Sequence, residues 1–125
     1  LAPAQDEPRS GQLIVHALAG GKAPDKRCEP AIFLTNDTNT ALHAAVLRHR
    51  WVTEAGEIGD ATGSLVVRLA AGKTAFVALA ALEQPCAQLT LKVENLSCRD
   101  DQAQPGQCPG SLQGQSFGMK GLQLP

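Results

Sequence analysis

The amino-acid sequence predicts an all-β sandwich, and two observations lead to this fold class. Short apolar runs recur along the chain, and each ends at a cluster of Gly, Pro, Asn, Asp or charged residues that favours a turn. Several runs also alternate apolar and polar side chains, as strands with one buried face do. At 125 residues the chain has the length of one domain. We expect one seven-stranded antiparallel sandwich over residues 11–125, after a flexible mature N-terminus over residues 1–10.

The apolar runs justify the strands one by one. The sixth run is the clearest, because residues 89–94 alternate between Leu or Val on one side and Thr, Lys or Glu on the other. The last run is interrupted by glycine and predicts the weakest strand. In chain order the runs cover residues 11–18, 28–35, 41–53, 64–70, 74–82, 86–95 and 115–124.

Two of these runs raise an alternative fold class. Residues 41–51 and 74–82 are rich in Ala and Leu, which prefer helices, so an α+β fold with helices there is the alternative. Against a helix, Val77 stands three residues after Thr74, where a capping box would supply an acidic side chain.

The third run also alternates, which favours a strand. His43, His49 and Trp51 fall on one face of this strand, and Arg48 and Arg50 fall on the other, as on a strand with one solvated side. The alternation leaves open whether Trp51 belongs to the core or to the rim of the arginine face.

Four cysteines indicate both a compartment and a disulfide pattern. If the seven strands run alternately up and down, Cys28 and Cys86 open the second and sixth strands at the same end of the sandwich. Cys98 follows the sixth strand at the far end, roughly 30 Å away, too far for a disulfide to Cys28. We therefore predict the pairs Cys28–Cys86 and Cys98–Cys108. The even cysteine count, the absence of zinc-ligand spacing and the missing initial Met favour a periplasmic or secreted protein after removal of a signal peptide.

Residues 41–80 carry a resemblance to a known architecture. An alternating strand with Trp51 runs into the acidic-glycine turn 54–56, and a second turn at 71–73 opens the next strand. This order of elements, with cysteines opening the second and sixth runs, resembles small bacterial exported domains of the immunoglobulin or fibronectin type III class. The resemblance implies a β-sandwich and does not imply an activity.

Composition and motifs argue against several functions. The net charge of −1 and the lack of a basic cluster give no basis for a nucleic-acid partner, and no apolar run is long enough for membrane insertion. His16, His43 and His49 lack metal-ligand spacing, and no nucleophile motif or phosphate-binding loop is present. We therefore expect no cofactor, no metal and no enzymatic activity.

The segment between Cys98 and Cys108 is the first candidate for a binding site. It holds nine residues without Leu, Ile, Val or an aromatic side chain, which indicates an exposed loop clasped by a disulfide. A clasped loop is either preorganised for recognition or a staple against proteolysis, and the sequence leaves both open. The predicted contact residues are Arg99, Asp100, Asp101 and Gln104 in the loop, with Arg48 and Arg50 second.

The function that these observations favour is a non-enzymatic exported module that binds another protein, either an envelope accessory factor or a secreted protein meeting a host. One alternative is a protease inhibitor that presents Arg99 in the clasped loop. A second alternative is a structural homodimer formed when the final run pairs with, or exchanges into, a neighbouring copy.

Overall fold

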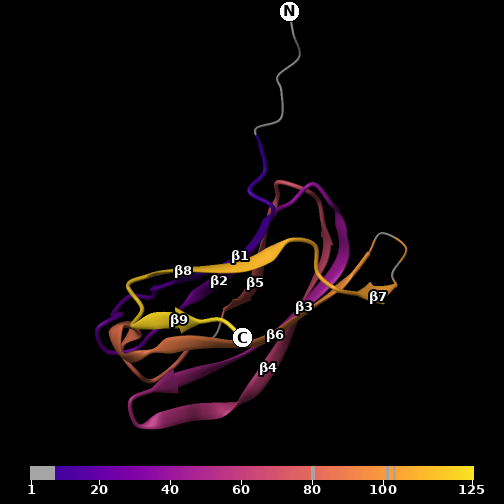
Figure 1. Cartoon of the computed structure of the whole chain (residues 1–125). Coiled ribbons are helices and arrows are strands. Elements are labelled where there is room, and N and C mark those ends of the chain that lie inside the picture. The colour runs from indigo at the N-terminus through magenta and orange to yellow at the C-terminus, as the bar shows by residue number, and fades with distance from the viewer. Residues whose placement is uncertain (1–7, 80, 101, 103) are drawn as a thin grey trace, which may run out of the picture.

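The structure is a computed structural model that describes residues 8–79, 81–100, 102 and 104–125. In this part of the chain the secondary structure is all β apart from one short 3₁₀ turn. Two sheets pack face to face, as Figure 1 shows. The elements are β1 (Gln12–Leu18), β2 (Ala31–Asp37), β3 (Leu42–Thr53), β4 (Gly56–Leu69), β5 (Thr74–Leu79), the 3₁₀ turn η1 (Cys86–Gln88), β6 (Thr90–Arg99), β7 (Pro105–Gly106), β8 (Ser111–Phe117) and β9 (Gly121–Gln123).

The strands form two separate sheets. Sheet 1 has the order β5-β2-β1-β8, and sheet 2 has the order β4-β3-β6, with β7 and β9 pairing with opposite ends of β6. The predicted all-β class is confirmed, but the described residues form nine strands rather than seven. The prediction of a wholly antiparallel sandwich is also wrong, because β8 runs parallel to β1 and β9 runs parallel to β6.

The extra strands come from the C-terminal part of the chain. The predicted last run over 115–124 divides at Gly118, which has a φ of 74° and therefore turns the chain where other residues would be strained. The segment before the turn joins sheet 1 and the segment after it joins sheet 2. The strand β7 is added by the clasped segment, which the sequence analysis treated as a loop.

The core lies between the two sheets and is built by alternation. In β1 the buried side chains are Leu13, Val15 and Ala17, each at most 1% exposed, while the residues between them are half-buried on the outer face. The strand β2 follows the same period, with Ile32 and Leu34 buried. Strands with this period present one row to the core and one row outward.

The strand β3 shows where the predicted alternation is right and where it fails. Leu47, His49 and Trp51 are buried as one inward row, so Trp51 is a core residue at 5% exposure. His43, which the alternation placed on the same face as the buried His49, is exposed. The register sets His43 opposite Arg68, a non-glycine residue with a φ of 55°, where the regular alternation of the hairpin breaks.

The helical alternative is wrong for both segments. Residues 42–53 and 74–79 are strands, each paired with neighbours in a sheet. Helix propensity is a weak local preference, and backbone pairing with flanking strands overrides it here.

The strand β4 begins earlier than predicted. The sequence predicts a turn at residues 54–56 and a strand only from residue 64, but the structure turns only at Glu54–Ala55 and pairs Gly56 with Thr53. The result is the long β3–β4 hairpin at the bottom of Figure 1. Most of the added residues are exposed, so no buried apolar row marked them as a strand in the sequence.

Both disulfides have the pairing that the strand directions predict. Cys28 bonds to Cys86 with Cα atoms 4.7 Å apart, and Cys98 bonds to Cys108 with Cα atoms 4.9 Å apart. Cys98 lies within β6 rather than after it, and Cys28 lies three residues before β2, bridged to Leu82.

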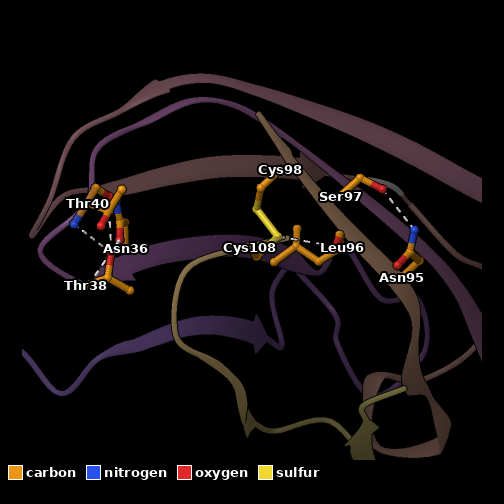
Figure 2. The surroundings of a disulfide bond; sticks show 8 residues. All are labelled: Asn36, Thr38, Thr40, Asn95, Leu96, Ser97, Cys98 and Cys108. Carbon is orange, nitrogen blue, oxygen red and sulfur yellow. Dashed lines mark hydrogen bonds between the residues drawn. A yellow bond between two sulfur atoms is a disulfide. The ribbon is translucent and has the colours of Figure 1, made fainter. Parts of the chain in front are cut away.

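A buried amide fixes the turn between β2 and β3. The Asn36 side chain is fully buried, and its Nδ2 donates to the carbonyl oxygens of Thr40 and Leu69 at 2.9 and 3.1 Å. Its Oδ1 accepts hydrogen bonds from the backbone N and the Oγ1 of Thr38. Figure 2 shows this cluster beside the Cys98–Cys108 disulfide. The network joins the β2–β3 turn to the end of β4, and it gives both ends of the buried Asn36 amide hydrogen-bond partners.

Candidate interaction surface

The outer face of sheet 1 collects aromatic side chains that sequence analysis placed elsewhere. In the order of the strands, one row across the sheet consists of Phe76, Phe33, His16 and Gln115. Opposite residues in neighbouring strands share a face, so these four side chains point away from the core together. Phe33 and Phe76 meet edge to face, with ring centroids 5.6 Å apart.

A neighbouring row on this face is also apolar. Leu18 lies opposite Phe117 in the parallel β1–β8 pair, and Ile14 lies one step along β1 on the other side of His16. Phe76 and Phe117 are 53% and 61% exposed, values that belong to surface side chains. We call this surface the Phe face and define it as Ile14, His16, Leu18, Phe33, Phe76 and Phe117.

Hydroxyl groups border the Phe face on one side. The Thr35 Oγ1 lies 2.7 Å from the Thr74 Oγ1 and 3.0 Å from the His16 Nε2, which makes a chain of three side chains across three strands. These hydrogen bonds hold the His16 ring in a fixed position on the sheet.

The Phe face carries almost no charge. Among the outward side chains of sheet 1 that the structure describes, Asp37 is the one carboxylate or cationic group other than His16, and it lies at the end of β2. Its Oδ2 accepts a hydrogen bond from the backbone N of Ser10, and the contacts with Ser10 lower the pKa of Asp37. Such a flat, uncharged and aromatic surface has the composition of the central part of a protein interface.

Phe33 and Phe76 lie within apolar runs, for which the core is the simplest expectation, but both lie on the outer face of sheet 1. In the runs that contain them, the residues at both parities are apolar, so alternation alone does not decide which face is buried. In β2 the buried face is the one that carries Ile32, Leu34 and Asn36. The Asn36 amide belongs on this face because it donates a hydrogen bond to the Leu69 carbonyl at the buried end of the strand. The cross-strand partners that reveal the Phe face are distant in sequence, so no local signal indicated them.

The clasped segment forms a short hairpin. The strand β7 pairs with the end of β6, Cys98 opposite Gly106 and Arg99 opposite Pro105, and it projects to the right in Figure 1. The disulfide closes this hairpin beside the carbonyl of Leu96, as Figure 2 shows.

The predicted contact residues of this segment have different surroundings. Arg99 lies within β6, Gln104 is exposed just before β7, and Asp101 lies outside the described residues. The Oδ1 of Asp100 accepts hydrogen bonds from the backbone N of Gln102 and of Gln104, both at 2.9 Å. Asp100 therefore caps its own turn. Arg99, Asp100 and Gln104 line one pocket of about 170 Å³, small for an organic ligand.

The two arginines of β3 also have different surroundings. Arg48 is exposed, whereas Arg50 donates to Glu94 on β6 and to Glu57 on β4, at 2.6 Å from the Glu57 Oε2. The hydrogen bond from Arg50 lowers the pKa of Glu94 and raises that of Arg50. Arg50 therefore links β3 to β4 and β6, whereas Arg48 is exposed on the same face.

The histidines are dispersed through the fold. His16 lies in β1 of sheet 1, whereas His43 and His49 lie in β3 of sheet 2, the first exposed and the second buried. In the described part of the chain, no group of three His, Cys, Asp or Glu side chains is placed to hold a metal ion.

A pocket of about 550 Å³ lies at one end of the sandwich. Glu54 from the β3–β4 turn and Lys120 from the β8–β9 turn face each other in it at 2.9 Å. This ion pair lowers the pKa of Glu54. The carboxylate is thus held as an anion beside its cation, which makes it a poor proton donor.

No family model matches the chain, and no curated protein or solved structure matches it either. None of the described helical segments is long and apolar enough to cross a membrane. Two disulfides are typical of proteins in oxidising compartments such as the periplasm or the extracellular space.

Proposed function

We propose that this protein is a non-enzymatic exported module that binds another protein, and that the Phe face is its main contact surface. The observation that carries the proposal is the outward placement of all three phenylalanines of the sequence on one uncharged sheet face. A side chain of this size is ordinarily buried, so exposing Phe76 and Phe117 needs a reason beyond the stability of this chain.

Aromatic side chains are suited to this role. Phe is enriched at interfaces because one rigid ring removes a large apolar area from water with little loss of side-chain entropy. The Phe33–Phe76 contact and the Thr35–His16 hydrogen bond hold two central side chains in place before binding. A preorganised surface loses less conformational freedom when it binds.

An immunoglobulin or fibronectin type III architecture is part of this proposal. Strands β5-β2-β1 in one sheet and β3-β6 in the other support it, because such domains have the same neighbours among their first six strands. The parallel pairing of β9 with β6 departs from that pattern. In such sandwiches both sheet faces and end loops are available to partners.

The clasped hairpin is the second contact surface of the proposal, through Gln104 and the adjoining Arg99. The protease-inhibitor hypothesis gains less support, because Arg99 is held in the β6–β7 ladder rather than in an extended loop. The hypothesis of a homodimer that exchanges the final run gains no support. All seven residues of β8 pair with β1 of the same chain.

The test is site-specific photo-crosslinking. A benzophenone side chain placed at Gln115, on the Phe face, is irradiated in extracts of the cell envelope and of the medium of the source cell. We expect one protein to be captured, and its capture to fall at least tenfold, about 1.4 kcal/mol, in the Phe76→Ser and Phe117→Ser variants.

Leu124→Ser provides the matched control, since Leu124 is an exposed apolar residue outside sheet 1. It should leave the capture unchanged. Equal capture by the Phe76→Ser and Phe117→Ser variants would contradict the Phe face. Replacing residues 102 and 104 by glycine inside the intact clasp would then test the hairpin.

A further inference from the structure

The strand β4 forms an open edge of sheet 2. It is 14 residues long, pairs with β3 on one side, and has no strand on its other side among the described residues. An edge strand presents a row of N–H and C=O groups that can pair with a further strand. Figure 1 shows β4 along the outer margin of the molecule.

Only the central part of β4 is regular. Gly59 and Arg68 both have positive φ values, 63° and 55°, and the register with β3 shifts between Ile58 and Thr62. Between these irregularities, Thr62 to Val67 pair with six consecutive residues of β3 without interruption. Irregularities of this kind limit edge pairing to the straight segment that they enclose.

The straight segment is uncharged and apolar on its outward side. Leu65 and Val67 are 63% and 61% exposed, and both lie beside the outward Val46 of β3. Asp60 and Arg68 bracket the segment with opposite charges. Neither takes part in an ion pair with another described residue.

These charges select a second copy of the chain as the partner. If two copies of β4 pair antiparallel about a two-fold axis at Ser64, Gly63 comes opposite Leu65, and Thr62 comes opposite Val66. Asp60 and Arg68 are each four residues from Ser64, so each Asp60 reaches the level of the partner's Arg68. A two-fold axis repeats this attraction at both ends of the contact.

Other registers lose this match. A shift of the axis by one residue brings Asp60 to the level of Ala70 or of Val66 instead. The two-fold axis also keeps the outward residues of both copies on one side, where the two Leu65 side chains are diagonal neighbours across the axis. The charges and the apolar side chains therefore agree on one register.

We propose that two copies of this chain associate through β4, antiparallel about Ser64, and extend sheet 2 across the dimer. A contact of five residues a side, 62–66, buries less area than a standard interface, so the dimer is weak and depends on concentration. This association does not use the Phe face and is independent of the function proposed above.

The test is sedimentation equilibrium of the oxidised protein from micromolar to millimolar concentration. We expect a reversible monomer–dimer equilibrium. Asp60→Arg places two positive charges at each end of the contact, and Arg68→Asp places two negative charges there. Each single variant should dimerise about tenfold more weakly than the wild type.

A mixture of Asp60→Arg and Arg68→Asp tests the register in which the two β4 strands pair. In a mixed pair every end of the contact again carries opposite charges, so the mixture should form a heterodimer at concentrations where each variant alone is monomeric. The double variant Asp60→Arg/Arg68→Asp should likewise dimerise as the wild type does. Asp25→Arg, an exposed change of equal charge elsewhere, is the matched control and should leave dimerisation unchanged.

Three results would overturn the proposal. The first is a strict monomer at millimolar concentration. The second is a dimer that keeps its affinity in Asp60→Arg and in Leu65→Lys, which puts a charge on the edge. The third is a mixture of single variants that stays monomeric, which would exclude this register. Far-UV circular dichroism and the thermal midpoint establish that each variant folds.

Discussion

At the scale of single residues, His49 carries a polar atom that the fold leaves without a partner. The side chain is 3% exposed, packs edge to face near Trp51, and its Nδ1 has no hydrogen-bond partner among the described residues. Burial lowers the pKa of His49, because the protonated ring loses its hydration in the core. His49 is therefore neutral in the folded protein where an exposed histidine would already be charged.

This burial makes stability depend on pH. Below the ordinary value of 6.5 the unfolded chain binds a proton at His49 while the folded chain does not, so the free energy of unfolding falls as the pH falls. The loss stops below the lowered pKa of the folded protein. Chemical denaturation between pH 7.5 and pH 5 should show this slope. The His49→Phe variant should be flatter, and an unchanged slope in that variant would exclude His49 as the cause.

At the scale of elements, the two disulfides have unequal effects. The Cys28–Cys86 bond spans a sequence separation of 58 residues and the Cys98–Cys108 bond one of 10. In the chain-entropy model the first stabilises by about 4 kcal/mol and the second by roughly 2–3 kcal/mol, because the longer loop has more freedom when unfolded. The second bond also fixes the β6–β7 hairpin locally.

We therefore expect Cys28→Ser/Cys86→Ser to lower the unfolding free energy more than Cys98→Ser/Cys108→Ser does. Urea denaturation of the two double variants, both compared with the oxidised wild type, measures the difference. A larger loss from the shorter bond would show that the hairpin contributes native contacts beyond its loop entropy.

Elements with a clear period were predictable from sequence. The alternation in β6 and in most of β3 identified both strands and their buried rows, and the strand directions gave the cysteine pairs. The first half of β4 and the short β7 were not predictable, because they are exposed and held by backbone pairing rather than by an apolar row.

The candidate site was harder to predict than the fold. Local sequence indicated Arg48 and the clasped residues as candidates, which stay predictions. The Phe face brings together β1, β2, β5 and β8, whose partners lie up to 99 residues apart, as in Gln12 and Ser111. Such a surface exists only after the pairing is known. The ion pairs of Arg50 likewise depend on the register between three strands.

At the scale of the whole molecule, the two sheets divide the chemistry of the surface. The outer face of sheet 1 is aromatic and nearly uncharged, whereas that of sheet 2 carries Arg48 and the network of Arg50, Glu57, Lys92 and Glu94. A dimer through β4 would leave a Phe face on each copy free. The assembled protein would then be bivalent.

Bivalency predicts a difference between dense and sparse partners. On a sensor surface coated densely with the captured partner, the wild type should dissociate at least tenfold more slowly than Leu65→Lys. On a sparse coating, where one copy binds at a time, the two should dissociate at equal rates. If Leu65→Lys also dissociated slowly from the dense coating, the avidity would not come from the β4 edge.

The parallel pairing of β8 with β1 has a consequence for the order of folding. The strand β1 is an edge strand of sheet 1 until residues 111–117 pair with it as β8. The strand β9 must then pair with β6 in the other sheet. Sheet 1 is thus incomplete until residues 111–117 are available to pair with β1. Folds dominated by such distant pairings form slowly. The outer strand of sheet 1 is thus added after the pairing of β1, β2 and β5, which needs residues 12–79 alone.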